Sequence, residues 1–144
     1  MGDKRDSTVK DWLGYPAALE QVIERLSGVI IENRNALEVM REYDSSDSLH
    51  YIDPPYVFST RDKGKDYRHE MDDVDHKILL EQVKTLQGMV IISGYENEVY
   101  SDLLADWMKV SRRALADGGV ARTEVLWISP SAANSKGIQM ELQV

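Results

Sequence analysis

The sequence predicts an α/β fold, in which a doubly wound sheet forms a single domain. Segments with helical spacing of apolar residues alternate along the chain with short runs of β-branched residues, as expected for helices covering a mostly parallel sheet. Residues 89–92 are fully apolar, which suits a central strand buried on both faces. At 144 residues and 42% hydrophobic composition, the chain is long enough for one core.

Two helices and two strands are expected in the first part of the chain. The first helix is expected to begin at Pro16, because proline suits a first turn, and apolar residues follow at helical spacing. Residues 29–31 predict a short β-branched strand, and Asn35 could cap the helix after it. A polar turn at residues 44–47 leads into residues 49–52, an apolar and aromatic run that predicts a buried strand.

The clearest helix follows residue 71. Either Asp72 or Asp73 is expected to cap this helix, and Gly88 is expected to end it. One face of the helix is predicted to be apolar and to carry Val74, Ile78, Leu79, Val83 and Leu86. His76 is expected on the opposite, exposed side.

The last part of the chain predicts one more helix and two strands. Residues 97–105 suit a helix, and residues 107–110 and 120–128 suit strands. Gly118 and Gly119 lie between the two strands, where a hairpin or loop turn is expected.

Composition suits a protein of a reducing compartment, and a cytoplasmic location is expected. The chain has no cysteine, so it contains neither disulfides nor thiolate metal sites. Its three histidines are not at ligand spacing, and no metal site is expected. No stretch approaches the roughly 20 apolar residues that span a membrane, and the polar first ten residues lack a secretory core.

The formal net charge of −8 argues against extensive nucleic-acid binding, since nucleic-acid-binding domains usually carry a basic patch. One basic cluster could nevertheless contact phosphates: Arg61, Lys63, Lys65 and Arg68. Because Asp62 and Asp66 are interleaved with these cations, an ordinary solvated loop is the alternative interpretation.

The most informative motif is Asp53-Pro54-Pro55-Tyr56, which directly follows the strand expected at residues 49–52. Two consecutive prolines donate no backbone hydrogen bond, so the strand must stop there. The loop would hold an acidic side chain, free carbonyls and an aromatic ring at the carboxyl edge of the sheet, where open α/β sheets bind ligands. A simple strand-ending turn is the alternative.

Such a loop suits methylation of an exocyclic aromatic amine. The lone pair of this amine is drawn into the ring, which makes the nitrogen a poor nucleophile. The Asp53 carboxylate and the Pro54 carbonyl could accept its two hydrogens and return electron density to it. Tyr56 could stack on the base and hold the nitrogen in line with a methyl donor. In-line transfer of this kind requires neither a metal nor a covalent nucleophile.

The Asp53 motif is one of five sequence markers that occur along the chain, at residues 28–36, 51–56, 67–71, 92–95 and 122–127. In this order they resemble the carboxyl-terminal part of the Dam-like adenine-specific DNA methyltransferases, most closely those of phages and prophages. The resemblance implies a catalytic domain at residues 16–130, between a flexible segment at residues 1–15 and a tail at residues 131–144. It also implies a partial Rossmann-like sheet of the S-adenosylmethionine-dependent type, whose last two strands form an antiparallel hairpin at the edge.

The resemblance implies transfer of a methyl group from S-adenosylmethionine to adenine N6 in DNA, in a restriction-modification setting, on a base flipped out of the duplex. The implied catalytic residues are Asp53, Pro54 and Tyr56. The expected substrate-binding residues are Pro55, Phe58, Tyr95 and the basic cluster of Arg61, Lys63, Lys65 and Arg68. Ordinary packing at the sheet edge is the alternative for Tyr95. The implied cofactor-binding residues are Asn35, Ala36 and Asp53. Asn35 and Ala36 depart from the family, which often has an aspartate followed by an aromatic residue there.

The family's glycine-rich Phe-x-Gly-x-Gly turn and the following acidic strand end are missing from this sequence. The chain is therefore expected to be one part of a methyltransferase, with weak DNA affinity alone, that needs a missing amino-terminal half or a homo-oligomer. Two alternatives stay open. The chain is an inactive remnant that binds a partner, or it methylates cytosine N4 or an RNA base.

Overall fold

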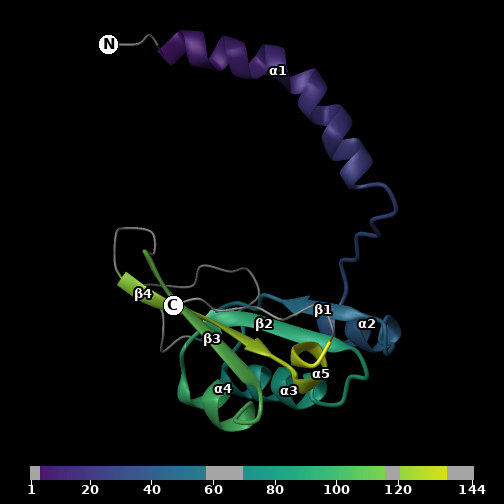
Figure 1. The fold of residues 1–144 in the computed structure, drawn as a ribbon, viewed down its shortest axis with the longest axis vertical. Helices are drawn as coiled ribbons and strands as arrows, with labels where there is room; N and C mark the ends of the chain where they lie inside the picture. The colour runs from purple at the N-terminus through teal and green to yellow at the C-terminus, as the bar shows by residue number, and fades with distance from the viewer. Residues whose placement is uncertain (1–3, 58–69, 116–120, 136–144) are drawn as a thin grey trace. The chain divides into compact units, whose positions relative to one another are not determined.

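The computed structural model describes residues 4–57, 70–115 and 121–135 (Figure 1). The chain divides into two compact units, Met1–Asn33 and Arg34–Val144. No helix in the described part of the chain is long and apolar enough to cross a membrane. Several residues of interest lie outside the described ranges: Phe58, Arg61, Lys63, Lys65, Arg68, Gly118 and Gly119.

The first unit contains one helix, α1 (Lys4–Arg25), so the start predicted at Pro16 is wrong. Pro16 lies inside the helix, and the helix also covers most of the segment that the sequence predicts to be flexible. After α1 the chain turns at Gly28, whose φ of +82° is a conformation that glycine adopts without a steric penalty. The domain boundaries inferred from the sequence stay predictions.

The strand predicted at residues 29–31 is wrong. These residues have no regular structure, and the side chain of Ile31 is 88% exposed. A β-branched run becomes a strand only when another strand completes its hydrogen-bond ladder, and none of the described strands pairs with this run.

The second unit is built on a mixed sheet of four strands, in the order β1-β2-β4-β3. The strands are β1 (Leu49–Ile52), β2 (Met89–Tyr95), β3 (Met108–Leu115) and β4 (Ala121–Ile128). β1 and β2 are parallel, whereas β4 runs antiparallel to both β2 and β3. The predicted α/β class and the antiparallel pairing of the last two strands at the edge are confirmed; the doubly wound, Rossmann-like arrangement stays a prediction.

The helices of this unit are α2 (Ala36–Glu42), α3 (Asp73–Val83), α4 (Glu98–Leu103) and α5 (Pro130–Ala133). Asn35 caps α2 by accepting a hydrogen bond from Leu37 N at 2.9 Å, as the sequence predicts. Asp72 caps α3 in a reciprocal capping box with Asp75. The helix ends at Val83 rather than at Gly88.

The segment expected to be a tail, residues 131–144, includes most of α5, and this helix packs against the sheet. Ala132 is fully buried, and Ser129 Oγ accepts a hydrogen bond from Val90 N at 3.0 Å. The folded unit therefore continues past residue 130 in the described part of the chain.

One face of the sheet is covered by α3 and α4, which lie on the same side of it (Figure 1). Along β2, buried residues alternate with half-buried ones, so the prediction of a strand buried on both faces is wrong. In β1, Leu49 and Tyr51 are 57% and 61% exposed because β1 is an edge strand and these side chains belong to the other face. The second face, referred to below as the open face, is therefore less covered.

The buried face of α3 differs from the predicted one. Val74 and Ile78 are 61% and 46% exposed, whereas His76 is buried and its Nδ1 lies 2.9 Å from the Tyr100 hydroxyl. His76 and Leu80 are four residues apart, so both lie on the stripe of the helix that meets the sheet. The prediction that His76 is exposed is wrong.

Tyr100→Phe is expected to lower the free energy of unfolding by about 1–2 kcal/mol, because it removes the hydroxyl partner of a buried imidazole nitrogen. Burial raises the pKa of Tyr100 above its ordinary value of 10.0. The folded state therefore holds this proton more tightly than the unfolded state does, so the contribution of Tyr100 is complete below pH 10 and falls as the pH rises further. Urea denaturation at pH 7 and above pH 10 should show the difference between the two proteins shrinking in alkali. An equal loss in Tyr15→Phe, which alters an exposed tyrosine, would contradict this explanation.

Asp44 links the start of β1 to the start of β2. Its Oδ2 accepts from Gln87 N at 2.8 Å, and its Oδ1 accepts from Gly88 N at 2.9 Å. The hydrogen bond from Gln87, followed by that from Gly88, lowers the pKa of Asp44 below its ordinary value of 3.8. Partial burial acts in the opposite direction, and His50 at 3.3 Å lowers the pKa by a smaller amount. A Cβ atom on Gly88 would lie 2.8 Å from the Ser48 carbonyl, so the close approach requires glycine.

Asp44→Asn is expected to lower the melting temperature by roughly 5 °C at pH 6, because an asparagine amide group cannot accept both backbone hydrogen bonds. The folded-state pKa of Asp44 is lowered, so its contribution is complete above pH 3.8 and is lost as the pH falls through the folded-state value. Melting curves of both proteins should therefore converge in acid. Asp47→Asn, in the same turn but exposed, should change little; equal losses in the two variants would contradict this role for Asp44.

Candidate active site

The Asp53 loop lies at the carboxyl end of β1. The strand ends at Ile52, directly before the motif, as the two prolines predict. Because β1 and β2 are parallel and Ile52 is opposite Ile92, the last residues of β2 lie beside the loop. The sheet edge that the sequence predicts for ligand binding therefore brings together the end of β1 and residues 93–95 of β2.

Ser93 connects these two strand ends. Its Oγ lies 2.9 Å from Asp53 Oδ1 and 3.2 Å from the carbonyl oxygen of Ile52. A hydroxyl has one hydrogen to donate, so the two acceptors share it. Asp53 is exposed, and in the described part of the chain its Oδ2 accepts no hydrogen bond. One carboxylate oxygen is thus held by the protein, and the other is available to a ligand.

Tyr56 and Tyr95 form the aromatic part of the site. Their ring centroids are 4.3 Å apart and their planes are tilted by 44°. The two rings come from different elements, the loop and the end of β2, and the contact holds Tyr56 beside Asp53. Asn97 donates to the Tyr95 carbonyl at 3.0 Å and caps α4, which anchors this end of β2.

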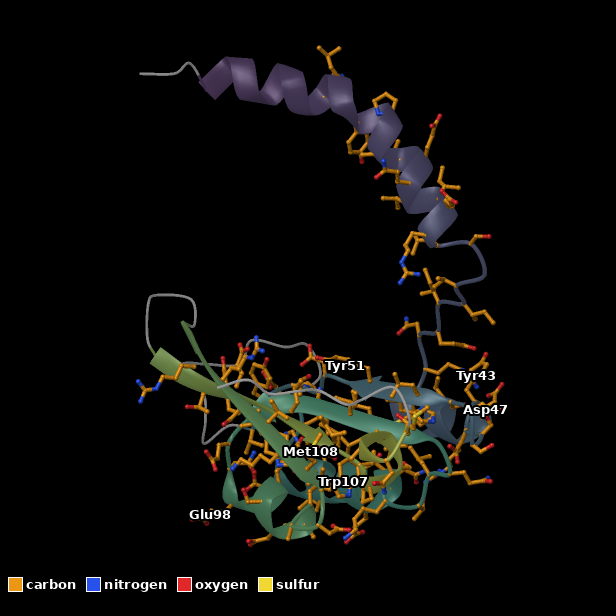
Figure 2. All side chains as sticks on the ribbon, in the orientation of Figure 1. Tyr43, Asp47, Tyr51, Glu98, Trp107 and Met108 are labelled. Atoms are coloured by element: carbon orange, nitrogen blue, oxygen red, sulfur yellow. The ribbon has the colours of Figure 1, made fainter. Side chains whose placement is uncertain are left out.

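A hollow of about 370 Å³ lies in front of Asp53 and Tyr56 on the open face of the sheet. It crosses all four strands and is lined by Tyr51, Asp53, Tyr56, Ser93, Gly94, Val110, Arg112, Glu124, Val125 and Leu126. The register explains this composition, because Ser93 is opposite Leu126, which is opposite Val110, so the three form one row across the sheet. Tyr51 lies on the same face, away from α3 and α4 (Figure 2).

The residues predicted from the sequence separate into four groups. Asp53 and Tyr56 line the hollow, while Pro54, Pro55 and Tyr95 line a small crevice behind Tyr56. Asn35 and Ala36 line neither, because Asn35 uses its side chain to cap α2. Phe58 and the four cations of the basic cluster lie outside the described residues.

Several lining residues were not singled out from the sequence, chiefly Ser93, Arg112 and Glu124. Ser93 lies in the marker at residues 92–95, which was a signal, but its bond to Asp53 depends on strand register. Glu124 lies in the marker at residues 122–127, whereas Arg112 lies in no marker. The two are opposite each other on β4 and β3, and the order of strands in the sheet brings them to the site.

The described part of the chain contains no group of three or more histidine, cysteine or acidic side chains placed to hold a metal ion. The described polar side chains that line the hollow are instead two carboxylates, two phenols, one guanidinium and the Ser93 hydroxyl, which is bonded to Asp53. This set suits recognition of a planar aromatic molecule with a hydrogen-bond donor at its edge.

Two comparisons bear on this site. Residues 15–115 match the model of a family described as D12 class N6 adenine-specific DNA methyltransferase, and the match includes the Asp53 loop and all of β2. A search of curated proteins finds no match.

Proposed function

Because the chain belongs to the D12 class of N6 adenine-specific DNA methyltransferases, we propose that it is the carboxyl-terminal part of such an enzyme and takes its methyl group from S-adenosylmethionine. The observation that supports this most is the bond between Ser93 Oγ and Asp53 Oδ1 at the mouth of a hollow of nucleotide size. The bond leaves one carboxylate oxygen for an amine.

In the proposed mechanism the chain binds and orients the amine of a flipped adenine. One amine hydrogen is donated to Asp53 Oδ2 and the other to the Pro54 carbonyl oxygen. Neither Pro54 nor Pro55 has a backbone N–H group that could compete for this oxygen. Both acceptors raise the electron density on nitrogen and stabilise the positive charge that develops during transfer. The base stacks on Tyr56, which Tyr95 supports from behind. The extra proton leaves nitrogen after the transfer.

The described residues fit S-adenosylmethionine poorly. The Asn35 side chain is engaged by the backbone of α2, and Ala36 offers no ring on which adenine could stack. We therefore propose that the donor is bound mainly by residues supplied by a missing amino-terminal half or by a second copy of the chain. DNA affinity of the chain alone is expected to be weak, given the net charge of −8.

A second candidate function is a remnant that binds a partner chain without catalysis, and the poor fit to the donor favours it. A labelled-methyl assay on duplex DNA, single-stranded DNA and RNA, over a range of chain concentrations, separates the candidates. Label in DNA that rises more steeply than the protein concentration supports a site completed by a second copy. Label in RNA alone would show that RNA, and not DNA, is the substrate. The absence of label with folded protein at every concentration would exclude a site completed by a second copy, and would leave the remnant and a chain that needs a missing amino-terminal half.

A further inference from the structure

The hollow in front of Asp53 has a cationic end. Arg112 on β3 lines it on the side remote from the Asp53 loop. In the order β1-β2-β4-β3, three strand spacings separate β1 from β3, a span of about 14 Å. A long guanidinium side chain and a ligand that starts at Asp53 can together bridge such a span.

The charge of Arg112 is available to a ligand. Its side chain is exposed and makes no ion pair within the described ranges, unlike Lys109, which pairs with Glu96, and Arg34, which pairs with Glu42. Glu124 is its cross-strand neighbour, but an interaction between exposed charges of this kind is weak and does not neutralise the guanidinium. Among the described residues that line the hollow, Arg112 is the one cation.

We propose that the hollow holds an entire adenine nucleotide, with the base at Asp53 and Tyr56 and the 5′-phosphate at Arg112. The inference rests on the proposed function, because it takes the base to be the methylation target. The floor between the two ends is formed by Leu126 and Val110, an apolar surface suited to the sugar and the base face. A guanidinium matches two phosphate oxygens in a bidentate geometry, which gives Arg112 a chemical reason to select a nucleotide over a nucleoside. Glu124 lies beside that phosphate and repels it.

The test compares binding of adenosine 5′-monophosphate and adenosine by NMR titration, at one ionic strength and without a methyl donor. The wild-type chain should bind the monophosphate about tenfold more tightly than adenosine, the effect of one charge-assisted contact. Arg112→Gln should abolish this preference, and Glu124→Gln should increase it. Arg113→Gln is the matched control: Arg113 has the same charge and is exposed on the same strand, but its side chain belongs to the other face and does not line the hollow.

Three outcomes would overturn the inference: equal binding of nucleotide and nucleoside by the wild-type chain, equal losses in Arg112→Gln and Arg113→Gln, or no perturbation by either ligand. A variant counts only if its amide spectrum away from the hollow matches that of the wild type. Because no methyl transfer is measured, the result is independent of the catalytic assay. If the chain methylates DNA but binds adenosine 5′-monophosphate no more tightly than adenosine, the proposed function stands and the role of Arg112 is wrong.

Discussion

Asp53→Asn is expected to reduce methyl transfer to DNA on the order of a thousandfold. The Asp53 carboxylate is a charged acceptor at the loop end of the hollow, and its Oδ1 is already fixed by Ser93. An asparagine in this position presents an amide that can point its own hydrogens at the amine, so the lone pair is no longer activated. Initial rates with labelled S-adenosylmethionine, measured under the conditions in which the wild type is active, give the effect directly.

The same substitution should leave the fold nearly unchanged, because Asp53 is exposed and its one bond in the described structure is to a neighbouring hydroxyl. Melting temperature provides this control. Asp102→Asn, which changes an exposed aspartate on α4 away from the hollow, should keep wild-type activity. Comparable activity of the Asp53 and Asp102 variants would remove Asp53 from the mechanism.

Tyr56→Ala is expected to lower kcat/KM for DNA by about ten- to a hundredfold, the effect of losing one base–aromatic stack. The free energy of unfolding should change little, since the ring of Tyr56 is only half-buried and packs against the ring of Tyr95. Steady-state kinetics on duplex DNA measure the effect.

Tyr56→Phe is the control for this variant. It keeps the ring and removes only the hydroxyl, so it separates stacking from a role of the hydroxyl. It should retain most of the activity. If phenylalanine were as damaging as alanine, the hydroxyl rather than stacking would account for the role of Tyr56, and the proposed geometry of the base would be wrong.

The features that the sequence predicts correctly depend on local chemistry. Asn35 and Asp72 cap helices because their side chains reach amides two or three residues away, and Pro54 ends β1 because it has no donor for the ladder. These effects act within one turn or one strand end. The markers also indicate the family correctly, because the family match covers residues 15–115, which include four of the five markers.

The features that it misses depend on neighbours distant in sequence. Residues 29–31 have strand propensity but no partner strand in the described structure, and His76 is buried because α4 supplies Tyr100 as its hydrogen-bond partner. The Ser93–Asp53 bond joins residues 40 apart and depends on the parallel register of β1 and β2. Arg112 joins the site through the order of four strands, which no local pattern encodes.

The most direct test of whether the Asp53 loop holds an adenine amine is nucleoside analysis of duplex DNA after incubation with the chain and labelled S-adenosylmethionine. The protein is used at the highest concentration at which it remains folded. Where a second copy of the chain completes the donor site, label is expected in N6-methyladenine and in no other nucleoside, and far less label is expected with Asp53→Asn. Label in N4-methylcytosine, or equal labelling by the Asp53 variant, would contradict the assignment of this loop as the site that holds the adenine amine.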